Sequence, residues 1–330
     1  MTKQEHIAHV VQNILKTRQE AGGINRVVWI GAGGSNGGNY PAQYFMEHES
    51  HTVNSYVFTS NEFVYATPAF VDQTTLVVAV SMRGTPETIN AARIARKLGA
   101  ATIGVYVDES DLTKVCDYNI SYDSLAIDSS NMGHTNSAIV LMIAMTLVEQ
   151  LEGYAEYTSA IKSFDLIDSI YRKAVEHITP LAQKWAQMNA DKPTINVLAC
   201  GPSFGAAYVF SICNIQEMLQ IDSVTTNSCD FFHGPFETLN KQTSVFQLIS
   251  AGRCRPADER AATFLKKHGG ERVYMLDAAE IGLYDFDTSI SEYFNHLLFS
   301  PILNNVYMRA LSKVTQKDYM TRRYMWKGIY

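Results

Sequence analysis

The chain has 330 residues, of which 46% are hydrophobic and 18% charged, and its formal net charge is -6 at pH 7. This length exceeds what one hydrophobic core comfortably holds, so we expect a globular protein of about two domains. Acidic and basic residues are mixed along the whole chain without a block of either sign. That distribution argues against nucleic acid and anionic membranes as partners.

The first residues and the cysteines bear on where the protein works. Residues 1–20 predict an amphipathic helix, without the apolar core and cleavage site of a secretion signal. No apolar run approaches the roughly 20 residues of a membrane helix. The cysteines are odd in number and widely spaced, and we interpret them as reduced, buried thiols: Cys116, Cys200, Cys213, Cys229 and Cys254. We therefore expect a cytoplasmic protein.

Two segments of the sequence follow one plan. Residues 26–45, "RVVWIGAGGSNGGNYPAQYF", begin with a β-branched and aromatic run, break at glycines and resume at helical spacing. Residues 194–219, "TINVLACGPSFGAAYVFSICNIQEML", do the same. At this offset of 168 residues, seven residues are identical, and they fall at the same turns in both halves. The repeat predicts a duplicated domain of strand, glycine turn and helix.

Further strands alternate with helical stretches in both halves. The segments "TLVVAVS" and "TIGVYV" lie in the first half, and "TSVFQLIS" and "RVYMLD" in the second. Such alternation predicts an α/β protein with two tandem doubly wound parallel sheets, each covered by helices on both faces, and with extra helical segments at both ends. We expect a first domain over residues 1–155, a helical linker over 156–190 and a second domain over 191–330.

The first glycine turn, "GAGGSNGG", presents backbone N–H groups at the positive end of a helix. Gly33, Gly34 and Ser35 in this turn therefore suit a phosphate or another anion. The turn is not the dinucleotide fingerprint G-x-G-x-x-G, and no acidic residue ends the next strand, "NSYVFTS", where a ribose hydroxyl would need it. We therefore expect no nicotinamide cofactor.

A second turn, "SMRGTPET" at residues 81–88, gathers hydroxyl groups and a guanidinium at the start of another helix. Ser81, Arg83 and Thr85 supply the chemistry that a phosphomonoester needs. The alternative is a well-capped helix with a surface arginine, since Thr85 stands at the N-cap. The counterpart in the second half, "SAGRCRPADE", lacks the hydroxyl cluster. This difference favours an anion site in the first half over capping alone.

The second half holds two residues of acid-base character that the first half lacks. Glu217 lies about 20 Å along the helix that begins near Ser203, so it cannot serve an anion bound at that helix start. Its neighbours, "CNIQEMLQI", are largely apolar, a setting that favours a general base. His233, in "DFFHGPFE", is either a proton-transfer group or a core imidazole. Phosphate anchoring and acid-base chemistry would then be divided between the two halves or between subunits.

These features together resemble the sugar isomerase (SIS) domain family over nearly the whole chain. The likeness rests on the "GGS" turn, the "SMRGT" cluster, the helix with Glu217, and "HGP" sixteen residues later. Within the family, "SCDFFHGPFE", "YFNHLLF" and "TRRYMWKGIY" resemble the deglycases of Amadori compounds. The turn "SMRGTPET" is one residue shorter than usual, Asp230 stands where relatives have Glu, and Lys327 is near but not at the family's C-terminal lysine spacing.

The resemblance implies roles for particular residues. Glu217 and His233 match the family's catalytic pair, with the histidine supplied by the partner subunit of a dimer. The positions that hold phosphate and sugar are matched by Ser35, Ser81, Arg83 and Thr85, and those of a further substrate-contacting loop by Thr135 and Ser137. The site needs no cofactor and no metal, and no cluster with metal-ligand spacing is evident in the sequence. We therefore expect a homodimer, or a higher homo-oligomer, with shared active sites.

The implied activity is hydrolysis of a 6-phosphorylated fructosyl or glucosyl amino acid to a hexose 6-phosphate and the free amino acid. One alternative is an aldose-ketose isomerase or a deaminase of an amino sugar phosphate. Another is a sugar-phosphate sensor without turnover. Arg322, Arg323 and Tyr324 near the C-terminus are candidates either for binding the amino-acid carboxylate or for subunit packing.

Overall fold

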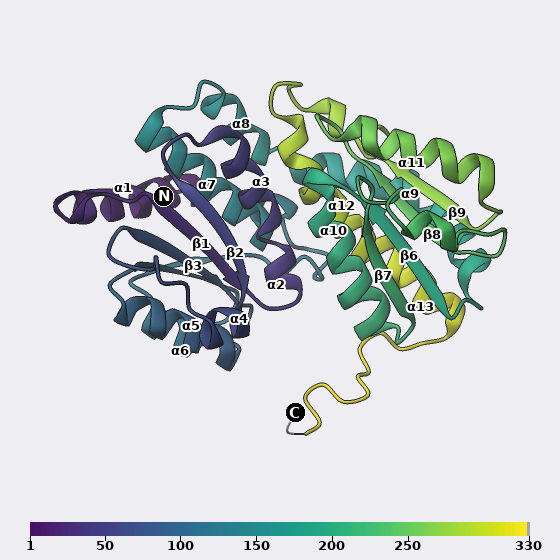
Figure 1. Cartoon of the computed structure of the whole chain (residues 1–330), viewed down its shortest axis with the longest axis horizontal. Helices are drawn as coiled ribbons and strands as arrows, with labels where there is room; N and C mark the ends of the chain where they lie inside the picture. The colour runs from purple at the N-terminus through teal and green to yellow at the C-terminus, as the bar shows by residue number, and fades with distance from the viewer. Residues whose placement is uncertain (329–330) are drawn as a thin grey trace. The chain divides into compact units, whose positions relative to one another are not determined.

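A computed structural model describes residues 1–328 of the chain, which divides into two compact units after residue 167. Each unit is built on one parallel sheet (Figure 1). Parallel neighbours need crossover connections, and in both units these connections are helical. The predicted fold class, two tandem doubly wound parallel sheets, is therefore confirmed.

The sheet of the first unit has the strand order β2-β1-β3-β4-β5. Its strands are β1 (Arg26–Gly31), β2 (Asn54–Thr59), β3 (Thr75–Val80), β4 (Ala101–Tyr106) and β5 (Tyr118–Ser121). Its helices are α1 (Lys3–Arg18), α2 (Gly34–Gly37), α3 (Tyr40–Glu49), α4 (Ser60–Tyr65), α5 (Pro86–Lys97), α6 (Asp111–Val115), α7 (Asn136–Glu152) and α8 (Tyr157–Phe164). Helices α4, α5 and α6 lie on one face of the sheet, and α1, α3 and α7 lie on the other (Figure 1).

The sheet of the second unit has the strand order β7-β6-β8-β9. Its strands are β6 (Thr194–Ala199), β7 (Asp222–Asn227), β8 (Val245–Ile249) and β9 (Val273–Asp277). Its α-helices are α9 (Ile167–Asn189), α10 (Phe204–Val209), α11 (Arg255–His268), α12 (Asn295–Ile302) and α13 (Arg309–Thr315). Two of them continue as π-helix, α10 into η4 (Phe210–Met218) and α12 into η9 (Leu303–Met308).

The internal repeat is visible in the strand positions. Strands β1 and β6 lie 168 residues apart, and so do β2 and β7. The strand order β2-β1-β3 of the first unit also matches β7-β6-β8 of the second. The duplication inferred from the sequence is therefore also present in the structure, because the first three strands of each unit have the same order in their sheet.

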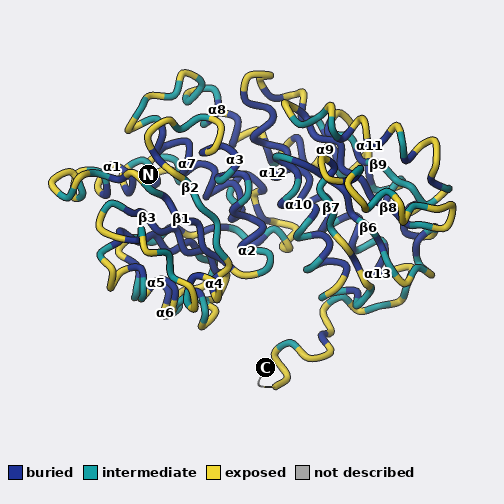
Figure 2. The backbone as a smooth tube through the Cα atoms, viewed as in Figure 1, coloured by how far each residue is buried: buried dark blue, intermediate teal, exposed yellow. Residues whose placement is uncertain are grey.

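The central strands carry the core of each unit. β3 and β8 are buried along their whole length, whereas the edge strand β2 is partly exposed (Figure 2). In the second unit the ring of Trp185 packs edge-on against Phe246 and Tyr307, with centroid distances of 5.1 and 5.5 Å. Trp185 belongs to α9, so this part of the predicted linker packs in the core of the second unit.

No helix within residues 1–328 is long and apolar enough to span a membrane.

The strand order also places the loops that follow the strands. In the first unit the chain goes from β1 to β2 on one side, and then crosses to β3 on the other side of β1. The carboxyl ends of β1 and β3 therefore flank a topological switch point, and those of β6 and β8 do the same in the second unit. Ligands of open parallel sheets bind at such points.

Candidate active site

The glycine turn after β1 is held in a shape that larger residues would not allow. Gly33 has a φ of 54°, and a Cβ on Gly31 would come within 2.7 Å of the backbone nitrogen of Asn36. Ser35 is half-buried in this turn, and its hydroxyl hydrogen-bonds to the phenol of Tyr122. Burial raises the pKa of Tyr122, so this partner stays neutral. The turn thus presents Gly33, Gly34 and Ser35 at the switch point.

The turn after β3 carries a row of hydroxyl groups that runs from the surface to the interior. Ser81 is buried, and its Oγ accepts a hydrogen bond of 2.9 Å from the backbone N–H of Thr85. The Oγ1 of Thr85, an exposed residue, lies 2.8 Å from the Oγ1 of buried Thr88. Thr88 in turn lies 2.7 Å from the Oγ of Ser60. Thr85 stands at the N-cap of α5, but its side chain makes no capping bond. Helix capping alone therefore does not explain these hydroxyls.

Arg83 contacts a surface carboxylate and does not join Ser81 and Thr85, with which the sequence groups it. Its Nε lies 3.0 Å from Oδ2 of Asp108, and the two side chains are 77% and 58% exposed. The guanidinium is thus tied to a surface carboxylate rather than to Ser81 or Thr85. An ion pair this exposed contributes little to stability, so its geometry places little constraint on where Arg83 goes when an anion is present.

Thr135 joins the same edge of the first sheet from a third loop. It is buried at the N-cap of α7, and its Oγ1 donates a bond of 3.1 Å to the carbonyl of Met132. The next residue, Asn136, packs directly on the glycine turn, because a Cβ on Gly38 would lie 2.2 Å from its Nδ2. The first unit therefore brings the loops of Gly33, Ser81 and Thr135 to one edge of one sheet.

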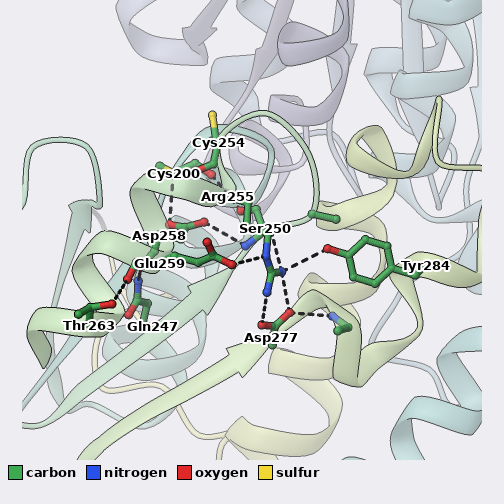
Figure 3. Close-up of polar contacts among 12 residues, drawn as sticks. Cys200, Gln247, Ser250, Cys254, Arg255, Asp258, Glu259, Thr263, Asp277 and Tyr284 are labelled. Carbon is green, nitrogen blue, oxygen red and sulfur yellow. Dashed lines mark hydrogen bonds and ion pairs between the residues drawn. The ribbon is translucent and has the colours of Figure 1, made fainter. Parts of the chain in front are cut away.

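The second unit fills the equivalent position with its own carboxylate (Figure 3). Asp258 is fully buried, and its two oxygens accept hydrogen bonds from the backbone N–H of Ser250, at 3.0 Å, and from the thiol of Cys200, at 3.2 Å. Asp258 lies two residues after the proline near the start of α11, as Thr88 does in α5. Burial raises the pKa of Asp258. An internal acid therefore replaces the hydroxyl row, which is why "SAGRCRPADE" lacks it.

The cation beside this carboxylate is also already paired. Arg255 donates to both oxygens of Asp277, at 2.9 and 2.7 Å, and its Nε donates to Glu259 at 2.7 Å (Figure 3). These bonds raise the pKa of Arg255 and occupy its guanidinium. The cation at the second switch point is thus already committed to carboxylates.

Glu217 lies at the end of η4 and is paired with a cation. Its Oε1 accepts a hydrogen bond of 2.7 Å from Nε of Arg322, and the two side chains are 23% and 7% exposed respectively. The expectation of apolar surroundings is therefore wrong for the carboxylate itself. Sequence neighbours do not show this contact, because the two residues are 105 positions apart.

His233 follows β7 and is exposed to solvent. Its backbone N–H donates to the carbonyl of Asp230 at 2.9 Å, while the neighbouring Phe231 is buried against Phe232 and Phe264. The core of this segment is made by the phenylalanines. The alternative of a core imidazole is thus wrong for His233, and its ring is accessible to a ligand.

Glu217 and His233 lie at opposite ends of one strand. Glu217 precedes the amino end of β7, and His233 follows its carboxyl end. Six residues of strand span roughly 20 Å. The second unit therefore does not bring the two candidate catalytic groups together by itself.

The cysteines differ from the prediction in one respect. Cys116 and Cys200 are buried and Cys213 and Cys254 are half-buried, but Cys229 is exposed. The expectation that all are buried is wrong for Cys229. No disulfide links them, and no cluster of His, Cys, Asp or Glu suited to a metal ion occurs within residues 1–328.

Comparison with known proteins places this geometry among phosphosugar enzymes. The chain is 33% identical over 313 residues to the fructosamine deglycase of Bacillus subtilis (strain 168), and the match covers 93% of each protein. It is 22% identical over 260 residues to the fructoselysine 6-phosphate deglycase of Escherichia coli (strain K12), covering 78% of this chain and 74% of that one. No family model matches the sequence.

A solved structure has the same fold over its full length. A protein of Salmonella typhimurium LT2, described as a candidate phosphosugar isomerase, superposes with a TM-score of 0.95 at 35% identity. The match covers 100% of this chain and 99% of that one. The chain thus shares the fold of both its units with this protein.

Proposed function

The chain belongs to the sugar isomerase (SIS) domain family, and we propose that it is a cofactor-free deglycase of 6-phosphorylated Amadori compounds. Its relatives identify it as an enzyme of the phosphosugar deglycase or isomerase class. The observation that carries the finer proposal is the match to a fructosamine deglycase over 93% of both chains. The substrate is then a fructosyl or glucosyl amino acid 6-phosphate.

The hydroxyl row of the first unit supports a phosphate at its switch point. Ser81 is already fixed by the N–H of Thr85, and Thr85 reaches the surface with a hydroxyl that does not cap its helix. Hydroxyl and backbone N–H donors at the start of α5 suit a phosphomonoester. The exposed pairing of Arg83 leaves that guanidinium able to move to the anion. We place the phosphate on this turn and on Gly33, Gly34 and Ser35, with Thr135 beside them.

The reaction that we propose is a proton shift followed by hydrolysis. In an open-chain ketosamine, Glu217 removes a proton from C1. The C–H electron pair forms a C1–C2 double bond while the C2=O π pair moves to the oxygen, which takes a proton. The proton then returns at C2 as the nitrogen lone pair forms a C1–N double bond, which gives the protonated imine of the aldose. Water adds to C1 and passes a proton to the nitrogen, and the C–N bond breaks as the remaining O–H pair forms the aldehyde, so that the free amine leaves. His233 assists ring opening and protonates the oxygen or nitrogen.

Two subunits complete this site in our proposal. Glu217 and His233 are separated by the length of β7, so one chain does not offer both to one substrate. An exposed His233 after the carboxyl end of β7 suits insertion into the site of a neighbour. We therefore propose a homodimer or higher homo-oligomer in which His233 comes from the partner.

Product analysis tests the proposed function. The protein is incubated with the 6-phosphates of fructoselysine, glucoselysine and fructose-asparagine, and a coupled glucose 6-phosphate assay with added phosphoglucose isomerase reads hexose phosphate. Free amino acid in equal amount supports deglycation. No turnover of any of the three substrates contradicts it.

One second candidate is supported by the solved structure described as a candidate phosphosugar isomerase. Aldose-ketose isomerisation, or deamination of an amino sugar phosphate, would use the same proton shift. Fructose 6-phosphate and glucosamine 6-phosphate therefore belong in the same experiment. Interconversion of hexose phosphates, or release of ammonia without amino acid, would favour this candidate.

A further inference from the structure

The segment that follows α13 covers the end of the helix that carries Glu217. This segment, residues 316–328, is the yellow stretch that leaves the second unit in Figure 1. Lys317 Nζ donates to Oε1 of Gln220 at 2.7 Å, and Gln220 Nε2 donates to the carbonyl of Thr321 at 3.3 Å. Gln220 has a φ of 57°, which a residue with a side chain rarely adopts. The segment is thus fastened to the turn that follows η4.

Arg322 is the buried centre of this contact. Its Nε donates to Glu217, its Nη1 donates to the carbonyl of Tyr319, and its guanidinium lies 5.5 Å from the ring centre of Trp326. Only 7% of its side chain is exposed. Side chains of arginine are seldom buried unless they are paired, so this placement is a built feature rather than a chance surface contact.

The contact leaves half of the carboxylate available. Arg322 engages Oε1, and no group within residues 1–328 donates a hydrogen bond to Oε2 of Glu217. A guanidinium on one oxygen restricts the orientation of the carboxylate, while the second oxygen remains to accept a proton. These are the two conditions that a general base must meet.

We propose that Arg322 is a positioning residue that holds Glu217 oriented for proton transfer. The proposal rests on the function proposed above. It also gives Arg322 a role other than binding the amino-acid carboxylate of the substrate, because its guanidinium is already committed to Glu217 and Tyr319. The C-terminal segment then belongs to the acid-base machinery of the second unit.

Kinetics of three variants test the role. Arg322→Gln should lower kcat by roughly 30-fold or more and leave KM within about threefold, because the group acts on the base and not on the substrate. Arg322→Lys should recover part of the loss, since it keeps a cation but not the fixed geometry of the guanidinium. Lys313→Gln, which removes an exposed cation from α13, should match the wild-type enzyme. Melting temperatures show that each variant is folded.

A rise in KM of Arg322→Gln with kcat unchanged would overturn the proposal in favour of carboxylate binding. Equal kinetics of Arg322→Gln and Lys313→Gln would overturn it as well. If the wild-type protein turns over none of the substrates, the proposed function itself fails. If the wild-type protein is active and Arg322→Gln is equally active, only the role of Arg322 fails.

A second measurement needs no turnover. Glu217→Ala should release the segment and raise the rate of tryptic cleavage after Arg322 by about tenfold, while Glu259→Ala, which breaks an ion pair on α11, should not. Cleavage sites are read by mass spectrometry. An unchanged cleavage rate in Glu217→Ala would show that the carboxylate does not hold Arg322, and would overturn the proposal.

Discussion

Two threonines of one turn differ in what their hydroxyls contact. Thr85 is exposed and makes no capping bond, whereas Thr88 is fully buried between Thr85 and Ser60. We expect Thr85→Ala to raise KM about tenfold and to leave kcat nearly unchanged, because a phosphate anchor binds ground and transition states alike. Steady-state kinetics with the substrate identified above measure this.

Thr88→Ala provides the matched control for that variant. It removes a buried hydroxyl between two partners, so it should lower the melting temperature, which Thr85→Ala should leave nearly unchanged. If Thr85→Ala lowered only kcat, the anchoring role would be wrong. These two variants therefore separate binding from stability within four residues.

His296 should make the second unit sensitive to acid. It is fully buried, neither ring nitrogen has a hydrogen-bond partner among residues 1–328, and burial lowers its pKa to about 3. An unfolded histidine has a pKa of about 6.5, so below that pH only the unfolded chain takes up the proton. Proton uptake by the unfolded chain therefore does not lower the free energy of unfolding well above pH 6.5, and it lowers that free energy by about 2 kcal/mol at pH 5.

Urea unfolding at pH 7.5 and pH 5 checks this effect. His296→Leu should lose less stability than the wild-type protein between the two pH values, by about 2 kcal/mol. Identical losses in both proteins would mean that His296 is hydrated or paired in the folded state.

At the residue scale, sequence reasoning identifies groups that local chain geometry brings together. Ser81 and Thr85 can be predicted, because they stand between a buried strand and a proline-started helix. The pairing of Glu217 with Arg322 cannot be, because hydrophobic periodicity contains no information on contacts between residues 105 positions apart. Asp258 could have been predicted in part. If Pro86 of α5 is aligned with Pro256 of α11, Asp258 falls at the position of Thr88.

At the element scale, α11 buries an acid, Asp258, where α5 buries Thr88. Asp258→Ala should lower the free energy of unfolding by about 2 kcal/mol, because the N–H of Ser250 and the thiol of Cys200 lose their acceptor in a buried site. Its neighbour Glu259 makes a partly exposed ion pair with Arg255 (Figure 3). Glu259→Ala should therefore cost less than about 1 kcal/mol. Urea unfolding of both variants measures the difference, and equal losses would contradict the role given to Asp258.

The strands show which elements sequence patterns predict. β1, β3, β6 and β8 are apolar runs that end at glycine or serine turns, and all four are predicted and present. β5 and β7 are not predicted. β7, "DSVTTN", is an edge strand in which only Ser223 is buried, so it does not need an apolar sequence.

At the scale of the whole molecule, the two duplicated units differ in the side chains that they place at their switch points. The first unit keeps hydroxyls at its switch point, and the second fills the same point with Asp258 and presents Glu217 and His233 elsewhere. Under the proposed function, the separation of Glu217 from His233 along β7 calls for a second copy of the chain.

Mixing two inactive variants tests whether subunits share a site. Glu217→Gln and His233→Asn should each lower turnover by roughly 100-fold or more, the usual contribution of a positioned acid or base. In a dimer whose sites take Glu217 from one chain and His233 from the other, a mixed dimer has one intact site and one doubly altered site. If random exchange makes half of the dimers mixed, equal amounts should recover about a quarter of wild-type activity. The two variants are unfolded and refolded together, and sedimentation confirms the oligomer. Recovery no greater than the sum of the two variants would mean that each chain uses its own Glu217 and His233, and that the distance along β7 is closed by a rearrangement within one chain.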